Sequence, residues 1–190
     1  GSGQCHYRAT HGSTGTLTPD MAPKLGPRLA AVARLVPEGL ALADIGTDHG
    51  RLPAWLLGSG KVPHVIAADC EAAPLEGARH RLRGTRADLR LGDGLNVLKP
   101  GEVGTLTIAG MGGRRMIEIL DAREDVRESL HCMVLQPQKE AEAVRRWLVS
   151  KEWRVLDEQV VEDRNRFYTV MSWEPGASRQ PWTDLDYRYG

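Results

Sequence analysis

Cysteine is scarce in this 190-residue sequence. Its three cysteines, Cys5, Cys70 and Cys132, are odd in number and widely spaced, which fits neither a disulfide framework nor a zinc site. A reducing, cytoplasmic environment is the simplest interpretation. We therefore expect no disulfide bond and no bound metal.

Long apolar runs and an excess of charge of one sign are also missing. The apolar stretches are far shorter than the roughly 20 residues of a membrane-spanning helix, and no basic-then-apolar signal peptide precedes them, so a soluble, intracellular protein without membrane association is expected. Lys plus Arg and Asp plus Glu each total 25. With zero formal net charge, any surface for nucleic acid must be a local patch.

The two ends of the chain differ in composition from the part between them. Residues 1–20 are rich in Gly, Ser, Thr and His and have almost no apolar periodicity, which predicts a flexible tail or an expression tag, with Met21 as a candidate native start. Residues 175–190 are predicted to form a polar C-terminal tail. One domain is expected over residues 21–174, and we expect it to be monomeric.

Apolar periodicity predicts a doubly wound α/β fold for that domain. Leu25 to Val36 repeat at helical spacing and are followed by Pro37 and Gly39, which predicts a first amphipathic helix. Short apolar runs predict five buried strands, at Leu40–Ile45, Val65–Ala68, Leu89–Leu91, Thr105–Ala109 and Cys132–Leu135. The segments between and after them predict helices at Leu52–Leu57, Ala73–Leu82, Arg114–Leu120 and Ala141–Val149. This alternation is typical of a mainly parallel sheet.

A hairpin is predicted after the last of these helices. Trp153–Val161 and Phe167–Trp173 are strand-like and are joined by the polar residues 162–166. Two consecutive strands with a short polar connection indicate antiparallel pairing at one side of the sheet.

The loop after the first predicted strand, Asp44-Ile45-Gly46-Thr47-Asp48-His49-Gly50, has the glycines of a nucleotide-type site. Its G-x-x-x-G spacing departs from the G-x-G-x-x-G of dinucleotide folds. Asp44 and Asp48 would repel a phosphate, whereas S-adenosylmethionine carries an ammonium and a sulfonium against one carboxylate. Two alternatives remain, in which Asp48 caps the next helix and His49 is structural. The cofactor-binding candidates here are Asp44, Gly46, Thr47, Asp48, His49 and Gly50.

The next two loops add further acids at the same edge of the sheet. Asp69 ends the second predicted strand, where an acid can accept both ribose hydroxyls, although a surface Asp at a strand end is the alternative. In Gly92-Asp93-Gly94 the acid suits an adenine amino group, although Asp-Gly is also a common turn. Asp69, Asp93 and Gly94 therefore join the cofactor-binding candidates.

The loop after the fourth predicted strand, Ala109-Gly110-Met111-Gly112-Gly113, lies where a methyl group and its acceptor should meet. Glycines there contribute little to packing, and we expect them to let backbone approach a flat substrate. The catalytic candidates are Asp48, Gly110, Met111 and Gly112, and Gly110 is also assigned to the cofactor. Of the two amides in Gln136-Pro137-Gln138, one is predicted to hold the turn and the other to bind substrate.

Taken together, Asp44–Gly50, Gly92–Leu95, Ile108–Gly113 and Leu135–Gln138 resemble the bacterial TrmK family, the tRNA (adenine(22)-N1)-methyltransferases. The resemblance extends from about Leu25 to Tyr168. It implies a Rossmann-like class I methyltransferase fold with a C-terminal antiparallel hairpin, S-adenosyl-L-methionine as cofactor, and methylation of N1 of adenine 22 in the D-arm of tRNA. Family members usually continue into a helical, coiled-coil-like region that is absent here.

For that chemistry the acceptor N1 has an available lone pair, so alignment matters more than a strong base. Asp48 is the candidate to stabilise the cationic product, and the paired base must first be flipped out. Arg51 stands where the family often has an aromatic residue. The substrate-binding candidates are Arg28, Arg51, Gly113, Arg114 and Gln138, with Lys24, Arg115 and Lys139 as further cations for tRNA. Two alternatives stay open: a methyltransferase for another RNA or a small molecule, and a non-catalytic module that binds the cofactor or RNA.

Overall fold

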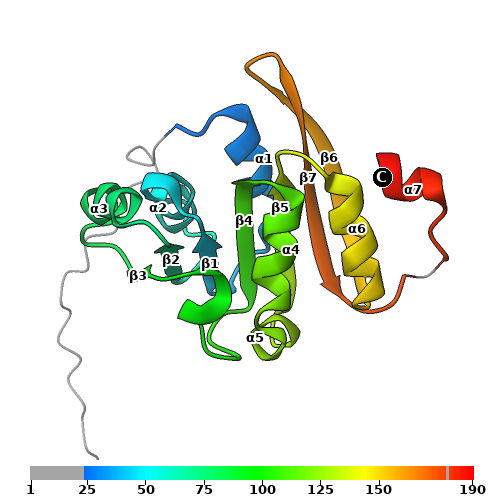
Figure 1. The fold of residues 1–190 in the computed structure, drawn as a ribbon. Helices are drawn as coiled ribbons and strands as arrows, with labels where there is room; N and C mark the ends of the chain where they lie inside the picture. The colour runs from blue at the N-terminus through cyan, green and yellow to red at the C-terminus, as the bar shows by residue number, and fades with distance from the viewer. Residues whose placement is uncertain (1–23, 179) are drawn as a thin grey trace, which may run out of the picture.

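The computed structural model describes residues 24–178 and 180–190, so the tail expected over residues 1–20 lies outside the described residues. A seven-stranded sheet has the order β3-β2-β1-β4-β5-β7-β6 (Figure 1). The strands are β1 (Leu42–Ile45), β2 (Val65–Asp69), β3 (Ala87–Leu91), β4 (Thr105–Met111), β5 (Cys132–Pro137), β6 (Trp153–Asp163) and β7 (Arg166–Pro175). The first five pair in parallel, while β7 is antiparallel to both β5 and β6. The predicted fold class, with its C-terminal hairpin, is confirmed.

Helices cover both faces of the sheet. One face carries α1 (Pro27–Leu35), α2 (Arg51–Gly58) and α3 (Ala72–Arg81), and the other carries α4 (Gly113–Asp121), α5 (Glu124–Glu128) and α6 (Ala141–Ser150). Two short 3-10 helices, η2 (Asp48–Gly50) and η3 (Gly94–Val97), follow β1 and β3, and α7 (Asp184–Tyr189) closes the chain. Every residue of β1 and β5 is buried, which explains why these strands are mostly apolar in the sequence, apart from Asp44 and Gln136.

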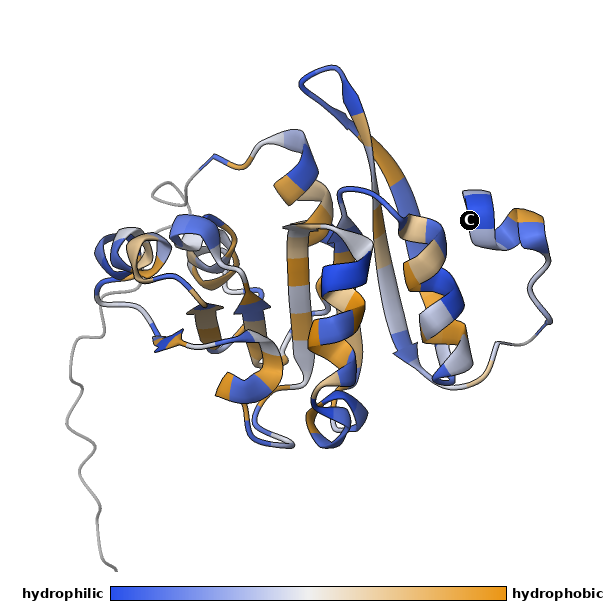
Figure 2. Ribbon diagram, viewed as in Figure 1, coloured by the Kyte–Doolittle hydropathy of each residue, from blue (hydrophilic) through white to orange (hydrophobic). Residues whose placement is uncertain are grey.

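The hydrophobic core is split by the sheet into two layers. Leu106, Ile108 and Leu135 point toward the α4–α6 face, whereas Leu42 and Val134 point toward α1–α3. Figure 2 shows the same division, with apolar colour on the strands and on the inner sides of the helices. Alternate residues of one strand thus supply opposite layers, which fixes the register of each strand.

Strand order reverses between β1 and β4, and this reversal places the candidate site. The chain winds outward to β2 and β3 on one side and to β5, β7 and β6 on the other. In open α/β sheets a crevice forms beyond the carboxyl ends of the strands at this point. The loops after β1 and β4 therefore lie on its two sides.

Several boundaries differ from the prediction. The first helix begins at Pro27, which is favoured at the first helical position. Strand β4 continues through Met111 and β5 through Pro137, so residues predicted as loops belong to the strands. The hairpin strands are longer than predicted, because the turn needs only Arg164 and Asn165, both at positive φ, as in two-residue hairpin turns.

Helix α7 was not predicted, because the segment 175–190 has little apolar periodicity. Thr183 caps it in a reciprocal capping box with Asp186. The Trp182 ring stacks on the buried Trp173 with ring centroids 5.8 Å apart. Arg145, whose side chain is 2% exposed, donates a 2.9 Å hydrogen bond to the carbonyl of Tyr187. Tertiary contacts therefore hold this helix. Within the part of the chain that the structure describes, no helix is both long and apolar enough to cross a membrane.

The core layers predict how two leucine truncations differ. Leu106 is 0% exposed between β4 and the helices, whereas Leu156 on β6 is 53% exposed. We expect Leu106→Ala to lower the free energy of unfolding by about 2–5 kcal/mol, because it leaves a cavity. Leu156→Ala should change it by less than about 0.5 kcal/mol. Urea unfolding monitored by circular dichroism measures both, and equal losses would contradict the described packing.

Candidate active site

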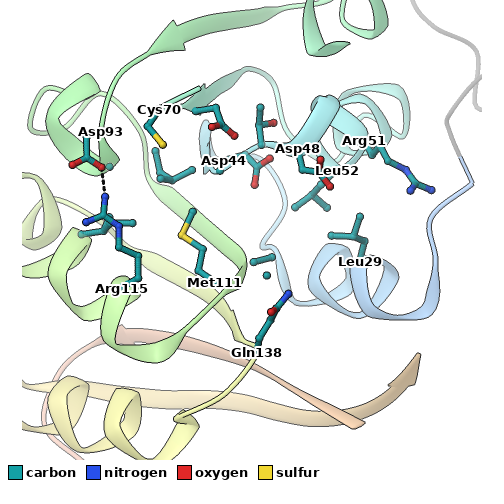
Figure 3. Close-up of a pocket in the computed structure, with 18 of the residues that line it drawn as sticks. Leu29, Asp44, Asp48, Arg51, Leu52, Cys70, Asp93, Met111, Arg115 and Gln138 are labelled. Atoms are coloured by element: carbon teal, nitrogen blue, oxygen red, sulfur yellow. Dashed lines mark hydrogen bonds and ion pairs between the residues drawn. The ribbon is translucent and has the colours of Figure 1, made fainter. Parts of the chain in front are cut away.

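A cavity of about 310 Å³ opens at the carboxyl edge of the parallel strands (Figure 3). It is lined by residues of the loops after β1, β2, β3, β4 and β5, together with residues of α1, α2 and α4. Its volume falls within the roughly 300–1,000 Å³ typical of small-molecule sites. The strand reversal therefore does produce a pocket that could hold a ligand.

The loop after β1 is the most constrained part of the cavity wall. Asp48 and His49 have positive φ values of 38° and 61°, in the left-handed region that non-glycine residues seldom adopt. Gly46, at φ 75°, and Thr47 both donate to the carbonyl of Ala68 on β2, at 2.8 and 3.1 Å. These bonds turn the loop sharply and hold its backbone against the cavity.

Asp44 is buried at the floor of the cavity. It is 4% exposed, and its Oδ1 accepts a 2.7 Å hydrogen bond from the Thr107 hydroxyl. Thr107 is its direct partner in the parallel pairing of β1 with β4. Burial raises the pKa of the Asp44 carboxyl from its ordinary value of 3.8 to about 6, although the bond from Thr107 acts against this. A positive ligand beside Asp44 would therefore be favoured.

Two further acids line the cavity from β2 and β3. Asp69 follows the β2 core, and its Oδ1 accepts a 3.0 Å hydrogen bond from the backbone N–H of Glu71. Asp93 forms an ion pair with Arg115 of α4, shown as the dashed contact in Figure 3. Asp93 therefore has a cationic partner of its own, which its sequence context did not predict.

The end of β4 forms the opposite wall. The pairing of β4 with β5 shifts register between Ala109 and Met111, and Gly110 at this bulge has a φ of 83°. The backbone N–H of Gln138 donates to the carbonyl of Met111 at 2.8 Å, which ties the loop after β5 to the bulge. Figure 3 shows the Met111 side chain near the middle of the site, between Asp44 and Gln138.

Arg28 reaches the same wall from α1. Its Nη1 donates a 2.5 Å hydrogen bond to Oε1 of Gln136, which is 0% exposed and itself donates to the carbonyl of Pro137. The guanidinium also lies 5.7 Å from the centroid of the Tyr168 ring. Of the two amides, Gln136 holds the turn while Gln138 lines the cavity, which leaves Gln138 as the candidate for substrate. The structure thus fixes a cation beside Gly110.

Most of the predicted site residues meet at this cavity. Those that line it are Arg28, Asp44, Gly46, Thr47, Asp48, Arg51, Asp69, Asp93, Gly94, Gly110, Met111 and Gln138. Arg51 is at the rim, where it donates to the carbonyl of Lys24 and points away from the acids in Figure 3. The side chain of Asp48 is 81% exposed, so it lies at the mouth of the cavity.

The other predicted site residues lie outside the cavity lining. His49 lies against Gly77 of α3, and Gly50 packs on Ala78 and Leu82. Gly112 lies next to Lys139, and Arg114 forms a 3.1 Å ion pair with Glu140. The expectation that these glycines contribute little to packing is wrong for Gly113. A Cβ at this position would lie 2.6 Å from the Glu140 carbonyl, so only glycine fits this close contact.

Sequence reasoning missed two side chains that organise the site. Thr107 is 0% exposed and holds Asp44 from 63 positions away in the chain. Arg115 had been assigned only to RNA, whereas it forms the ion pair with Asp93 inside the cavity. The strand register could have indicated Thr107, because parallel pairing puts it opposite Asp44. No signal in the sequence identified the partner of Asp93.

Comparisons with known proteins agree with this geometry. A family described as a methyltransferase domain matches residues 25–171. The tRNA (adenine(22)-N(1))-methyltransferase of Bacillus subtilis is 35% identical over 80% of this chain, and the match spans 66% of that protein, or about two thirds of its length.

Two solved structures are similar in fold as well. The crystal structure of the B. subtilis M1A22 tRNA methyltransferase TrmK is 34% identical, with a TM-score of 0.76 over 81% of this chain and 68% of that one. A putative tRNA (m1A22) methyltransferase from Streptococcus pneumoniae, solved in complex with S-adenosyl-L-methionine, is 29% identical with a TM-score of 0.82. That match covers 86% of this chain and 78% of the other.

The raised pKa of Asp44 predicts a pH dependence of stability. Because the unfolded carboxyl loses its proton more readily than the buried one, the carboxyl destabilises the fold as pH rises from about 4 to 6. Asp44→Asn keeps an acceptor for Thr107 but does not ionise. Its free energy of unfolding, relative to that of the unsubstituted protein, should rise by up to about 3 kcal/mol between pH 4 and pH 7. Urea unfolding at the two pH values measures this difference, and a constant difference would contradict the burial of a titrating Asp44.

Proposed function

Because this chain belongs to the TrmK family of methyltransferases, we propose that it methylates N1 of adenine 22 in tRNA, with S-adenosyl-L-methionine as the cofactor. The family relationship rests on the match over residues 25–171 and on the 34% identity to a structure of which 68% is covered. The chain's own cavity supports the proposal independently. Its shape, its acids and its neighbouring cations each correspond to one requirement of that reaction.

The charges of the cavity fit this cofactor and disfavour a dinucleotide. Asp44, Asp48 and Asp69 line the half of the cavity formed by β1 and β2. A phosphate there would be repelled by three carboxylates in a partly desolvated space. A ligand with an ammonium and a sulfonium would instead be attracted, and its presence would favour the ionised form of Asp44.

Unused hydrogen-bonding groups also support a polar ligand at this position. The hydroxyl of Thr47 is buried; it lies near enough to the Asp44 carboxyl to lower the pKa of that group, but it forms no hydrogen bond of good geometry with any described residue. A buried, unpaired hydroxyl costs free energy that a ligand's polar group could recover. We assign the methionyl part of the cofactor to the loop Gly46–Asp48, the ribose to Asp69, and the adenine to the Asp93 and Gly94 side.

When bound, the cofactor would supply an electrophilic methyl group, and the chain's task is to align an acceptor with it. Gly110 and Met111 form the wall that the acceptor base would contact, because the bulge in β4 turns their backbone toward the cavity. Gln138 adds an amide that can bond a base edge. No base is needed at N1, whose lone pair is already available, so alignment is the main contribution of these residues.

The product of this reaction is a cationic base, and the chain offers acids to stabilise it. Asp48 lies at the mouth of the cavity, and Asp44 lies on its floor. Solvent screens the exposed Asp48 carboxylate, so its effect on the barrier should be modest. Asp44 lies in a drier environment, where the same charge acts more strongly.

Cations around the cavity suit a polyanionic substrate. Arg28 and Arg51 line it. The carbonyl of Lys24 accepts a hydrogen bond from Arg51, and Lys139 lies next to Gly112. None of these four forms an ion pair within residues 24–178 and 180–190. They are therefore available to contact phosphates, which would position a tRNA for base flipping.

The observation that carries the proposal is the acid-lined cavity at the strand reversal of a TrmK-family fold. Incubation with methyl-labelled S-adenosylmethionine and unmodified tRNA transcripts tests it. We expect label in N1-methyladenosine at position 22 and no label in a transcript with guanine at that position. Label in another nucleoside would overturn the proposed position, and cofactor binding without any labelled RNA would overturn the proposed substrate.

Asp69 provides a test of the cofactor assignment. Asp69→Ala should weaken S-adenosylmethionine binding by about 1–3 kcal/mol, because it removes hydrogen bonds from the ribose hydroxyls to a charged acceptor. Asp88→Ala is the matched control, since Asp88 is a strand acid of β3 whose partners are His64 and Arg90. Isothermal titration calorimetry measures both dissociation constants. Equal affinities in the two variants would reject the ribose role of Asp69.

A further inference from the structure

The hairpin of β6 and β7 extends beyond the rest of the sheet at the edge where the active site opens. Strand β5 pairs with β7 only through Met171–Trp173, whereas β6 stays paired with β7 as far as Asp163 and Arg166. Because β7 is antiparallel to β5, its first residues lie at the carboxyl edge of the parallel strands. Figure 1 shows this two-stranded end projecting past the end of β4.

The two faces of this projecting end differ in their surroundings. Val161 and Tyr168 are direct cross-strand partners on the face toward α1, where Val161 packs in the core layer of that helix and Arg28 lies over Tyr168. Residues alternate in direction along a strand, so Val160 and Phe167 are on the opposite face. There Phe167 is 73% exposed and Val160 is 66% exposed.

Val160 and Phe167 form one exposed apolar patch. Val160 pairs with Thr169, which places Phe167 at the diagonal position, within reach of an aromatic side chain. A single exposed apolar residue needs no explanation. This patch is unusual because it includes the only phenylalanine of the chain and lies on the part of the hairpin that projects at the carboxyl edge of the parallel strands.

Charges at the tip indicate the kind of partner that the patch fits. Arg164 lies in the turn and Arg166 precedes Phe167 on β7; both are exposed and take part in no ion pair of the described residues, and alternation places Arg166 on the α1 face with Tyr168. Of the two acids at the tip, Asp163 lies on the α1 face, next to Gly26, where an added Cβ would lie 3.5 Å from its Oδ2. Glu162, opposite Phe167, is the acid that shares its face.

We propose that Phe167 and Val160 form a docking surface for unpaired RNA nucleotides next to the target adenine, with Arg164 in the turn and Arg166 on the other face of the same projecting end as phosphate contacts. An exposed ring with guanidinium groups at the same end of a hairpin can stack a base and hold the neighbouring phosphates. The inference rests on the proposed function, because a flipped adenine in the cavity leaves its neighbours unstacked at this edge of the sheet. Stacking of one neighbour on Phe167 would hold the strand open.

Phe167 is tested against an aromatic residue of equal exposure elsewhere. Tyr189, at the end of α7, is 74% exposed. Phe167→Ala should weaken tRNA binding about 5- to 150-fold, the range found for loss of one base-stacking ring, while Phe167→Trp should stay within about threefold of the unsubstituted protein. Tyr189→Ala should change the tRNA dissociation constant by less than about twofold. Fluorescence anisotropy with labelled tRNA measures all three, and calorimetry should give the same S-adenosylmethionine affinity for each.

The arginines are tested through the salt dependence of tRNA binding. Arg164→Gln and Arg166→Gln should each reduce the slope of log Kd against log salt by about 0.7–0.9, as expected when one phosphate contact is lost. Arg188→Gln is the control, because Arg188 is exposed on α7. An unchanged slope in both hairpin variants would remove the phosphate role.

The outcomes separate this inference from the proposed function. If the unsubstituted protein binds and methylates tRNA but Phe167→Ala binds it equally well, the docking surface is wrong and the proposed function stands. If the unsubstituted protein binds no tRNA, both fail. Sedimentation velocity tests whether a second copy of the chain occupies the patch instead. A dimer that dissociates in the Phe167→Ala variant would assign the patch to self-association and overturn the RNA proposal.

Discussion

Burial of one carboxyl group between β1 and β4 is the constraint on which the site depends. Asp44 is 4% exposed, and its bond to Thr107 uses the register that joins the two halves of the sheet. An apolar residue at this position would stabilise the fold more, since a buried acid must either ionise in a poor solvent or hold its proton to a higher pH. The presence of an acid at this destabilising position is best explained by the ligand that it faces. A cationic ligand would offset the free-energy cost of burying the carboxylate.

The uneven distribution of charge around the cavity explains how a chain without net charge could bind two ligands of opposite charge. Its 25 acids and 25 basic residues are not evenly spread around the cavity. Asp44, Asp48 and Asp69 line the side formed by β1 and β2, whereas Arg28 stands at the β4 and β5 side, held by Gln136. A cofactor with cationic centres and an RNA with phosphates could therefore approach from different sides with little electrostatic conflict.

The fold could be predicted from the sequence because it is encoded locally, whereas much of the site could not. Strands covered on both faces leave continuous apolar runs, and glycines follow the strands at fixed places, so the sheet and most of the cavity loops were anticipated. Contacts between distant segments left no local signal. The pairing of Asp93 with Arg115, the stacking of Trp182 on Trp173 that holds α7, and the packing of Gly113 on Glu140 each depend on the assembled fold. His49 is the reverse case, since its side chain lies against α3, as the structural alternative for this residue expects.

Backbone geometry, more than charge, should decide which base enters the proposed acceptor site. The bulge in β4 puts Gly110 at a φ of 83°, and the loop after β5 is bonded to it through Gln138 and Met111, so this wall has little freedom to adapt. A rigid wall favours a flat ring that arrives already unstacked. The energy for unstacking must then come from contacts outside the cavity, because in the proposed arrangement the cavity itself contacts only the cofactor and the flipped base. In a protein of zero net charge, those contacts have to be local and well placed, since no long-range attraction would bring an RNA to the rim.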